Sequence, residues 1–202
     1  DLAAVVAHLP SYYPLDASEM ENYFELLHSS VNGPLMIYNI PATTRMSIPI
    51  SVVEALSRLP HFVGFKDSEN VKGRMEESAR KLGGRDDFSL FMGSAVLSVK
   101  ALKLGYDGLV PSSGNLVPDL WNDLYLYGLK QEWEKAEELQ TTLDGVAQLF
   151  QHNRSLGQSL AVLKAMLHSL EVCGPTVLPP LRTLSTQERD SVAEQLFNQY
   201  PF

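Results

Sequence analysis

The sequence is poor in cysteine, in positive charge and in long hydrophobic runs, and each shortage excludes a class of protein. Cys173 is the single cysteine among 202 residues, which excludes an internal disulfide framework and a cysteine-rich zinc site. A formal net charge of −8 argues against nucleic acid or an anionic membrane as a partner. No apolar run reaches the roughly 20 residues of a membrane span, and the first residues lack the basic start of a signal peptide. We therefore expect a cytoplasmic protein without nucleic-acid or membrane partners.

Signals for a metal or a cofactor are also missing. The five histidines show no ligand spacing with one another or with nearby carboxylates, which gives no reason to expect a metal site. No Gly-x-Gly-x-x-Gly motif follows any of the expected strands, so a dinucleotide cofactor has no support. We expect the protein to work without a cofactor.

The first half of the chain contains a repeating order of strand, loop and helix. Apolar runs predict five strands, at residues 3–9, 34–41, 61–66, 88–94 and 108–111. Helices are predicted between them, at 17–31, at 51–59 with Ser51 as the cap and Glu54 at capping-box spacing, at 70–82, and up to residue 103. This alternation is typical of a parallel sheet covered on both faces. An open doubly wound sheet and part of an eight-stranded barrel both fit it.

The last third of the chain contains no strand signal. After Asn115 the sequence predicts helices, at residues 118–129, 133–150, 159–170 and 186–198. We therefore expect two regions, an α/β region over residues 1–128 and a helical region over residues 129–202.

Lys66 stands at the end of the strand Phe-Val-Gly-Phe-Lys-Asp-Ser at residues 62–68. A lysine held at such a strand end is partly desolvated, which disfavours the ammonium and leaves a nucleophilic amine. The alternative is a surface lysine whose stem covers apolar neighbours. Asp67 and Glu69 follow it, and we interpret them as caps of the next helix rather than as an acid–base pair.

Three motifs together resemble the class I aldolase superfamily of dihydrodipicolinate synthase and N-acetylneuraminate lyase. They are Tyr-Asn-Ile-Pro-Ala-Thr-Thr at 38–44, Gly-Phe-Lys-Asp-Ser at 64–68 and Gly-Leu-Val-Pro at 108–111. The tyrosine and the lysine are 28 positions apart, as expected for one βα unit. The resemblance implies a TIM (β/α)8 barrel, of which strands 4–8 would be present, with a C-terminal helical extension. It also implies a homo-oligomer, a tetramer built as a dimer of dimers.

The resemblance implies roles for four residues. Lys66 would form a Schiff base with the ketone of pyruvate or of a larger 2-oxo acid, and Tyr38 would be the proton shuttle. Alternatively, Tyr38 would be a core tyrosine whose hydroxyl forms a hydrogen bond inside the protein. Tyr13, in the Ser-Tyr-Tyr loop, would either reach across a subunit interface into the proton relay or only pack there. Val110 would direct its backbone carbonyl at the Schiff base.

The motifs also narrow the expected substrate. Dihydrodipicolinate synthases carry an arginine for the second substrate at the position of Thr43, whereas Arg45 here stands two positions later. N-acetylneuraminate lyases carry acidic residues where this chain has Ser94. The expected substrate is therefore a 2-keto-3-deoxy sugar acid or a 4-hydroxy-2-oxo acid. The enzyme would cleave or dehydrate it, with pyruvate as product or co-substrate. Thr43, Thr44 and Ser94 would contact it, or would serve as turn or cap residues.

The carboxylate-binding loop of the family, of Gly-Thr-Thr type on its second strand, has no match in this chain. Thr43-Thr44 lies elsewhere in the pattern. Two alternatives to a lyase stay open: a condensation of the dihydrodipicolinate synthase type, and a catalytically incomplete fragment or assembly subunit. Because the carboxylate-binding loop is missing, we expect little or no activity from this chain by itself. Five strands alone would also leave two open edges and an uncovered barrel interior, which disfavours a stable monomer.

Overall fold

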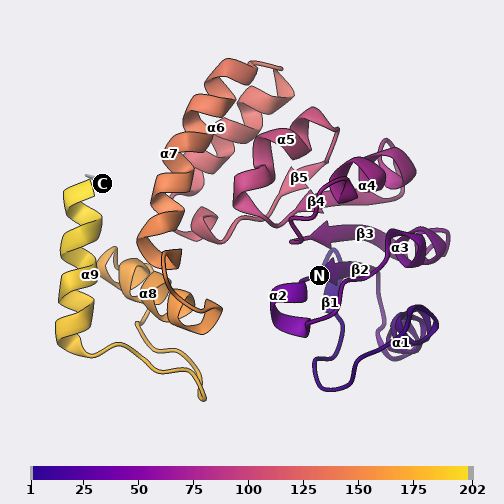
Figure 1. Ribbon diagram of the computed structural model, residues 1–202, viewed down its shortest axis with the longest axis horizontal. Helices are drawn as coiled ribbons and strands as arrows, with labels where there is room; N and C mark the ends of the chain where they lie inside the picture. The colour runs from indigo at the N-terminus through magenta and orange to yellow at the C-terminus, as the bar shows by residue number, and fades with distance from the viewer. Residues whose placement is uncertain (1, 200–202) are drawn as a thin grey trace. The chain divides into compact units, whose positions relative to one another are not determined.

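The computed structural model describes residues 2–199, which form two compact units (Figure 1). The first unit runs up to Pro111 and includes Tyr125–Ala136, and the second comprises Ser112–Leu124 and the residues from Glu137 onward. Within residues 2–199, no helix combines the length and the apolar character that crossing a membrane requires. The division predicted between residues 128 and 129 stays a prediction.

Five parallel strands form the sheet of the first unit. They are β1 (Val5–His8), β2 (Leu35–Asn39), β3 (Phe62–Asp67), β4 (Ser89–Met92) and β5 (Gly108–Leu109). Their order across the sheet is their order in the sequence, and each pairs in parallel with the next. A doubly wound sheet reverses its order at a switch point, so the sequential order favours the barrel. Each strand lies within about two residues of its predicted range.

The helices of the first unit follow the strands in turn. Up to Pro111 they are α1 (Ala17–Ser30), α2 (Pro41–Thr44), α3 (Ile50–Leu56), α4 (Arg74–Leu82) and α5 (Ser98–Lys103), the last preceded by the short 3-10 helix η1 (Ala95–Leu97). Asp16 caps α1, and Glu19 completes a capping box with it, which satisfies two of the free N–H groups of the first turn.

Two predictions about helix starts were wrong. Ser51 does not cap a helix, because α3 begins at Ile50 directly after Pro49 and has no side-chain cap. The helix predicted from residue 70 begins at Arg74, after Gly73, whose φ of 83° lies in the left-handed region that favours glycine. The single turn of α2 was not predicted, because the Tyr-Asn-Ile-Pro segment reads as a strand that ends at proline.

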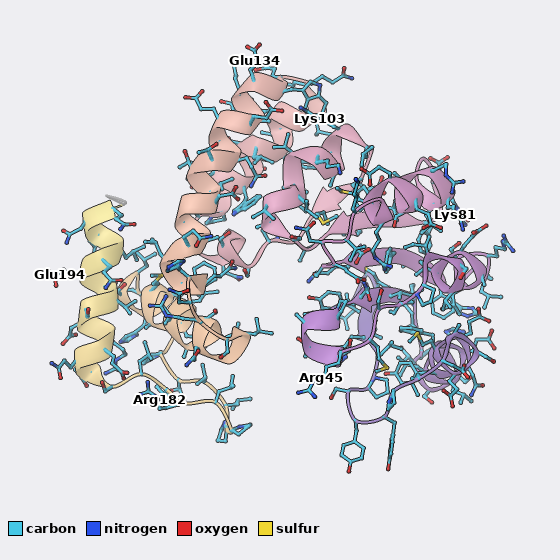
Figure 2. The ribbon with its side chains drawn as sticks, in the orientation of Figure 1. Arg45, Lys81, Lys103, Glu134, Arg182 and Glu194 are labelled. Carbon is cyan, nitrogen blue, oxygen red and sulfur yellow. The ribbon has the colours of Figure 1, made fainter. Side chains whose placement is uncertain are left out.

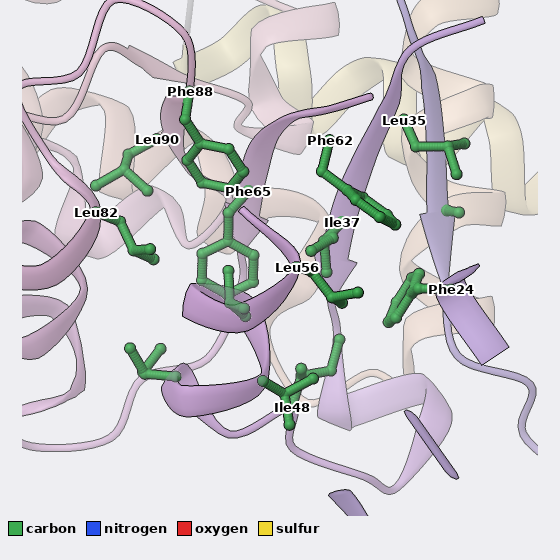
Figure 3. Packing of buried hydrophobic residues seen from close by; sticks show 14 of the residues in the cluster. Phe24, Leu35, Ile37, Ile48, Leu56, Phe62, Phe65, Leu82, Phe88 and Leu90 are labelled. Atoms are coloured by element: carbon green, nitrogen blue, oxygen red, sulfur yellow. The ribbon is translucent and has the colours of Figure 1, made fainter. Parts of the chain in front are cut away.

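An apolar core packs one face of the sheet against its helices (Figure 3). Its largest buried side chains include Phe24, Leu35, Ile37, Leu56, Phe62, Phe65, Leu82 and Leu90. The rings of Phe24 on α1 and Phe62 on β3 meet edge to face, with centroids 6.5 Å apart. Burial of each such side chain contributes about 1.5–3 kcal/mol to the stability of the first unit.

The two faces of the sheet differ in burial. Along β2, Leu35 and Ile37 are buried, whereas Met36 and Tyr38, which alternate with them, are only half-buried. Side chains alternate from one face of a strand to the other, so Tyr38 lies on the face opposite the core. This half-buried face also carries Lys66, the register partner of Tyr38.

A stacked histidine pair makes the stability of the first unit sensitive to pH. His28 on α1 lies over His61, which precedes β3, with ring centroids 3.4 Å apart and ring planes 5° from parallel. Burial, assisted by the charge of His28, lowers the pKa of His61 below its ordinary 6.5, while Glu25 opposes this shift. The folded state therefore prefers a neutral ring, and protonation favours unfolding.

We expect the stabilisation that the neutral His61 ring gives to the folded state to be complete above pH 6.5. It should be lost as the pH falls below that value. Thermal unfolding followed by circular dichroism, at about pH 7.5 and about pH 5.5, should show a smaller acid-induced fall of Tm in His61→Gln than in the wild type. His152→Gln removes an exposed histidine of the second unit and is the control. An equal fall in wild type and His61→Gln would contradict the prediction.

Helices account for the regular structure of the last third of the described chain, as predicted. They are α6 (Pro118–Leu129), α7 (Trp133–Gln151), α8 (Leu156–Ser169) and α9 (Thr186–Gln199), with the 3-10 helix η2 (Ser112–Asn115) before them. Ser155 and Gln158 form a capping box that starts α8 three residues before its predicted start at 159. Within the second unit, α8 packs against α9, which buries Val192 and Leu196.

Candidate active site

Tyr38 and Lys66 lie side by side near the carboxyl ends of adjacent strands. They are register partners on β2 and β3, each one residue before the end of its strand. Partners in a parallel pair project from the same face, which explains the contact between their side chains. The Lys66 Nζ atom is 4.0 Å from the centroid of the Tyr38 ring, a cation–π arrangement, and both residues are half-buried. The structure thus brings together the two residues predicted to be catalytic.

Ser68 lies beside this pair, although the sequence motifs predicted no role for it. Its hydroxyl donates a hydrogen bond of 3.4 Å to the Tyr38 hydroxyl. Its backbone N–H donates to the carbonyl of Asn39 at 3.0 Å, which continues the pairing of the two strands beyond their ends. A serine after a strand reads as a turn residue. Its position two residues after Lys66, on the same side of an extended chain, is the signal that identifies it.

Gly93 gives the lysine and the serine the space that they occupy. It follows β4, and its N–H donates to the carbonyl of Asp67 at 2.7 Å. A Cβ atom at this position would lie 2.0 Å from the Ser68 Oγ atom and 3.1 Å from the Lys66 Cε atom. The close approach of the backbone explains why a residue without a side chain stands here.

The predicted substrate contacts on α2 differ in exposure. Thr43 is exposed, whereas Thr44 is buried and its hydroxyl donates to the carbonyls of Ile40 and Met46 at 3.1 and 3.0 Å. Arg45 ends α2 with a left-handed φ of 60°, and its exposed side chain extends away from the helix (Figure 2). Ser94 is half-buried and its side chain caps no helix. The roles of these threonines and of Ser94 stay predictions.

Val110 and Tyr13 lie at the surface of the described chain. Val110 is 42% exposed, and its N–H donates to the carbonyl of Met92 at 2.8 Å. Tyr13 is 69% exposed and meets the ring of Tyr12 edge to face, at 4.7 Å between centroids. An exposed tyrosine pair is compatible with a subunit interface. The roles predicted for Val110 and Tyr13 stay predictions.

Asp67 and Glu69 are not helix caps, so that interpretation was wrong. No side chain caps α4, and both carboxylates accept hydrogen bonds from the Asn39 amide, at 2.8 and 2.9 Å. The Arg74 Nε atom lies 2.7 Å from Asp67 and 3.2 Å from Glu69. Burial raises the pKa of the Asp67 carboxyl above its ordinary 3.8, and the Arg74 guanidinium opposes this shift. Across residues 2–199, no cluster of three or more histidine, cysteine or acidic side chains is arranged to hold a metal ion.

Comparison with known proteins places this arrangement in a family. The model of the Dihydrodipicolinate synthetase family matches residues 2–199. A 4-hydroxy-tetrahydrodipicolinate synthase of Hyphomonas neptunium is 25% identical over 181 residues, 90% of this chain and 60% of the relative. The dihydrodipicolinate synthase of Bacteroides thetaiotaomicron superposes with a TM-score of 0.87 at 25% identity, over 98% of this chain and 67% of that chain.

A further solved structure is YagE of E. coli K12, a prophage protein of the dihydrodipicolinic acid synthase family in complex with pyruvate. It superposes with a TM-score of 0.84 at 24% identity, over 98% of this chain and 66% of that chain. The present chain spans 44–64% of the length of the first curated relatives that it matches. Its fold is α/β and TIM-barrel-like, with a C-terminal helical part, as the sequence motifs predicted. The chain belongs to the dihydrodipicolinate synthetase family.

Proposed function

We propose that this protein is a Schiff-base-forming lyase or aldolase that cleaves or dehydrates a 2-oxo acid, with pyruvate as product or co-substrate. One observation carries the proposal: the Lys66 Nζ atom lies 4.0 Å from the centroid of the Tyr38 ring, at the carboxyl edge of two neighbouring parallel strands. In barrels of this kind the reacting groups come from that edge. The pyruvate complex of YagE, which shares the fold, supports the choice of a 2-oxo acid.

In the proposed reaction, the neutral Lys66 amine attacks the ketone carbon, and the ketone oxygen leaves as water to give a protonated imine. The bond between the carbon next to the imine and the hydroxyl-bearing carbon then breaks. Its electron pair moves into the imine to give an enamine, and the hydroxyl-bearing carbon leaves as an aldehyde. Tyr38 supplies a proton to the leaving oxygen and later removes one from the substrate hydroxyl. The Ser68 hydroxyl, 3.4 Å from the phenol oxygen, orients this proton carrier.

Hydroxyl groups on and near the site favour a 2-keto-3-deoxy sugar acid or a 4-hydroxy-2-oxo acid as substrate. Thr43 is exposed on α2, and Ser94 follows Gly93, where an added Cβ atom would lie 3.1 Å from the Lys66 Cε atom. Both residues offer hydrogen bonds to a substrate hydroxyl. Condensation of the dihydrodipicolinate synthase type is the second candidate, because the curated relatives carry that name.

We further propose a cytoplasmic homo-oligomer, a dimer of dimers. The exposed pair of Tyr12 and Tyr13 supports an interface at this loop, since aromatic side chains are enriched at subunit contacts. Size-exclusion chromatography with light scattering tests this proposal, and a monomer at micromolar concentration would contradict it.

Trapping with borohydride tests the Schiff base. The protein is incubated with pyruvate, treated with borohydride and examined by intact mass spectrometry, with acetone as the control ketone that lacks a carboxylate. We expect a stable pyruvate adduct, and a folded protein without one would contradict the proposal. A panel of 2-oxo acids, scored for pyruvate release, water loss and condensation, then separates the lyase from the second candidate.

Gly93→Ala should slow this trapping while leaving the protein folded. The new methyl group would displace the Ser68 hydroxyl from Tyr38 and press on the Lys66 stem, and both are side-chain atoms that can shift. We expect a trapping rate about tenfold lower, which corresponds to about 1.4 kcal/mol. Gly128→Ala is the matched control, because its methyl group would meet Leu102 at 2.5 Å, away from the lysine. Equal trapping rates in the two variants would contradict the prediction.

A further inference from the structure

A polar cluster lies on the covered face of the sheet, directly behind the amine and the phenol. Asn39 follows Tyr38, Asp67 follows Lys66, and the two are register partners at the ends of β2 and β3. Their side chains project to the opposite face from Tyr38 and Lys66 and are fully buried. The Asn39 amide donates to Asp67 at 2.8 Å, a cross-strand bond one residue beyond the site. This bond resists any slip of one strand against the other.

Arg74 ties the same strand ends to the structure around them. Its side chain is 9% exposed, and its Nε–H donates to Asp67 at 2.7 Å. Its Nη2 atom donates to the carbonyl of Ile48 at 2.9 Å. The N–H of Ile48 in turn donates to the Asn39 side-chain oxygen at 3.0 Å, which closes a ring of contacts. One planar guanidinium thus joins the start of α4, the segment before α3 and the end of β3.

We propose that Asn39 and Arg74 are positioning residues for the reaction at Lys66. Acting through Asp67, they hold β2 and β3 in the register that sets the Lys66 Nζ atom over the Tyr38 ring and Ser68 beside the phenol. They do not touch the reacting atoms, since they lie on the other face of the sheet. The inference rests on the proposed function, and its physical basis is that a misplacement of about 1 Å can cost about 100-fold in rate.

The test compares borohydride trapping in Arg74→Met, Arg74→Lys and wild type over a range of pyruvate concentrations. Loss of positioning should lower the maximal trapping rate per folded molecule by up to about 100-fold in Arg74→Met, with the half-saturating pyruvate concentration nearly unchanged. Arg74→Lys keeps the charge but loses the planar fork, so it should recover part of the rate. It also serves as the milder variant if Arg74→Met does not fold.

Arg85→Met is the matched control. Arg85 also joins two segments, because it donates to the hydroxyl and carbonyl of Ser57 at 2.9 and 2.8 Å and pairs with Asp87 at 2.9 Å. It lies before the amino end of β4, at the other end of the strands. We expect Arg85→Met to lower Tm but to leave the maximal trapping rate of the folded protein unchanged.

The outcomes separate this inference from the proposed function. If wild type and folded Arg74→Met trap pyruvate equally fast, or if Arg85→Met slows trapping as much as Arg74→Met, the positioning role is overturned while the Schiff base stands. If the folded wild type traps no pyruvate, the proposed function fails, and this inference fails with it.

Discussion

Replacing Lys66 by arginine is expected to abolish the pyruvate adduct while the protein stays folded. A guanidinium keeps the positive charge and can still lie over the Tyr38 ring, so the cation–π contact survives. It stays protonated at any accessible pH and cannot attack a ketone, so no imine forms. Because Lys66 is half-buried on the face opposite the core, the substitution disturbs little packing. Intact mass after borohydride treatment measures the loss, and circular dichroism checks the fold.

Lys72→Arg is the control for this experiment, since Lys72 is an exposed lysine in the segment between β3 and α4. It should leave the adduct at the wild-type level. An adduct of wild-type yield in Lys66→Arg would show that another amine reacts, and the assignment of the nucleophile would then be wrong.

Tyr38→Phe is expected to have the second largest effect. Phenylalanine keeps the ring on which the lysine packs but removes the proton carrier and the acceptor of the Ser68 hydrogen bond. Proton transfer by a positioned side chain contributes about 100- to 10,000-fold, so turnover of the 2-oxo acid should fall by that factor. The pyruvate adduct should still form, though slowly, because the amine remains.

The matched control for the phenol is Tyr125→Phe. The Tyr125 hydroxyl donates to the carbonyl of Asp107 at 3.1 Å in the same unit and has no part in the proposed chemistry. Its loss should cost about 1 kcal/mol of stability and leave turnover unchanged. Turnover by Tyr38→Phe at the rate of Tyr125→Phe would refute the proton-shuttle role.

The strands were predictable because each is a short apolar run bounded by proline, glycine or polar turn residues. The starts of the helices were less predictable from the sequence. Ser51 has good capping chemistry, yet Pro49 sets the start of α3 because the chain must turn there to bury Ile50. Local preferences of about 1 kcal/mol are overridden by such packing.

The proximity of Tyr38 and Lys66 was predictable from the sequence, but its geometry was not. The spacing of one βα unit placed Tyr38 and Lys66 at the same edge of the sheet. Their alignment depends on a register shift at Leu35/Met36, which no local pattern in the sequence reveals. Arg74 was missed for a related reason: charged residues at a helix start are common, and only the folded chain brings this one to Asp67.

The central claim is that one amine, Lys66, is the nucleophile of this protein. Its most direct test is peptide mapping by tandem mass spectrometry after reaction with pyruvate and borohydride. We expect the reduced pyruvate adduct on the peptide that contains Lys66, and on the lysine itself. An adduct confined to any other lysine, or spread evenly over the exposed ones, would contradict it.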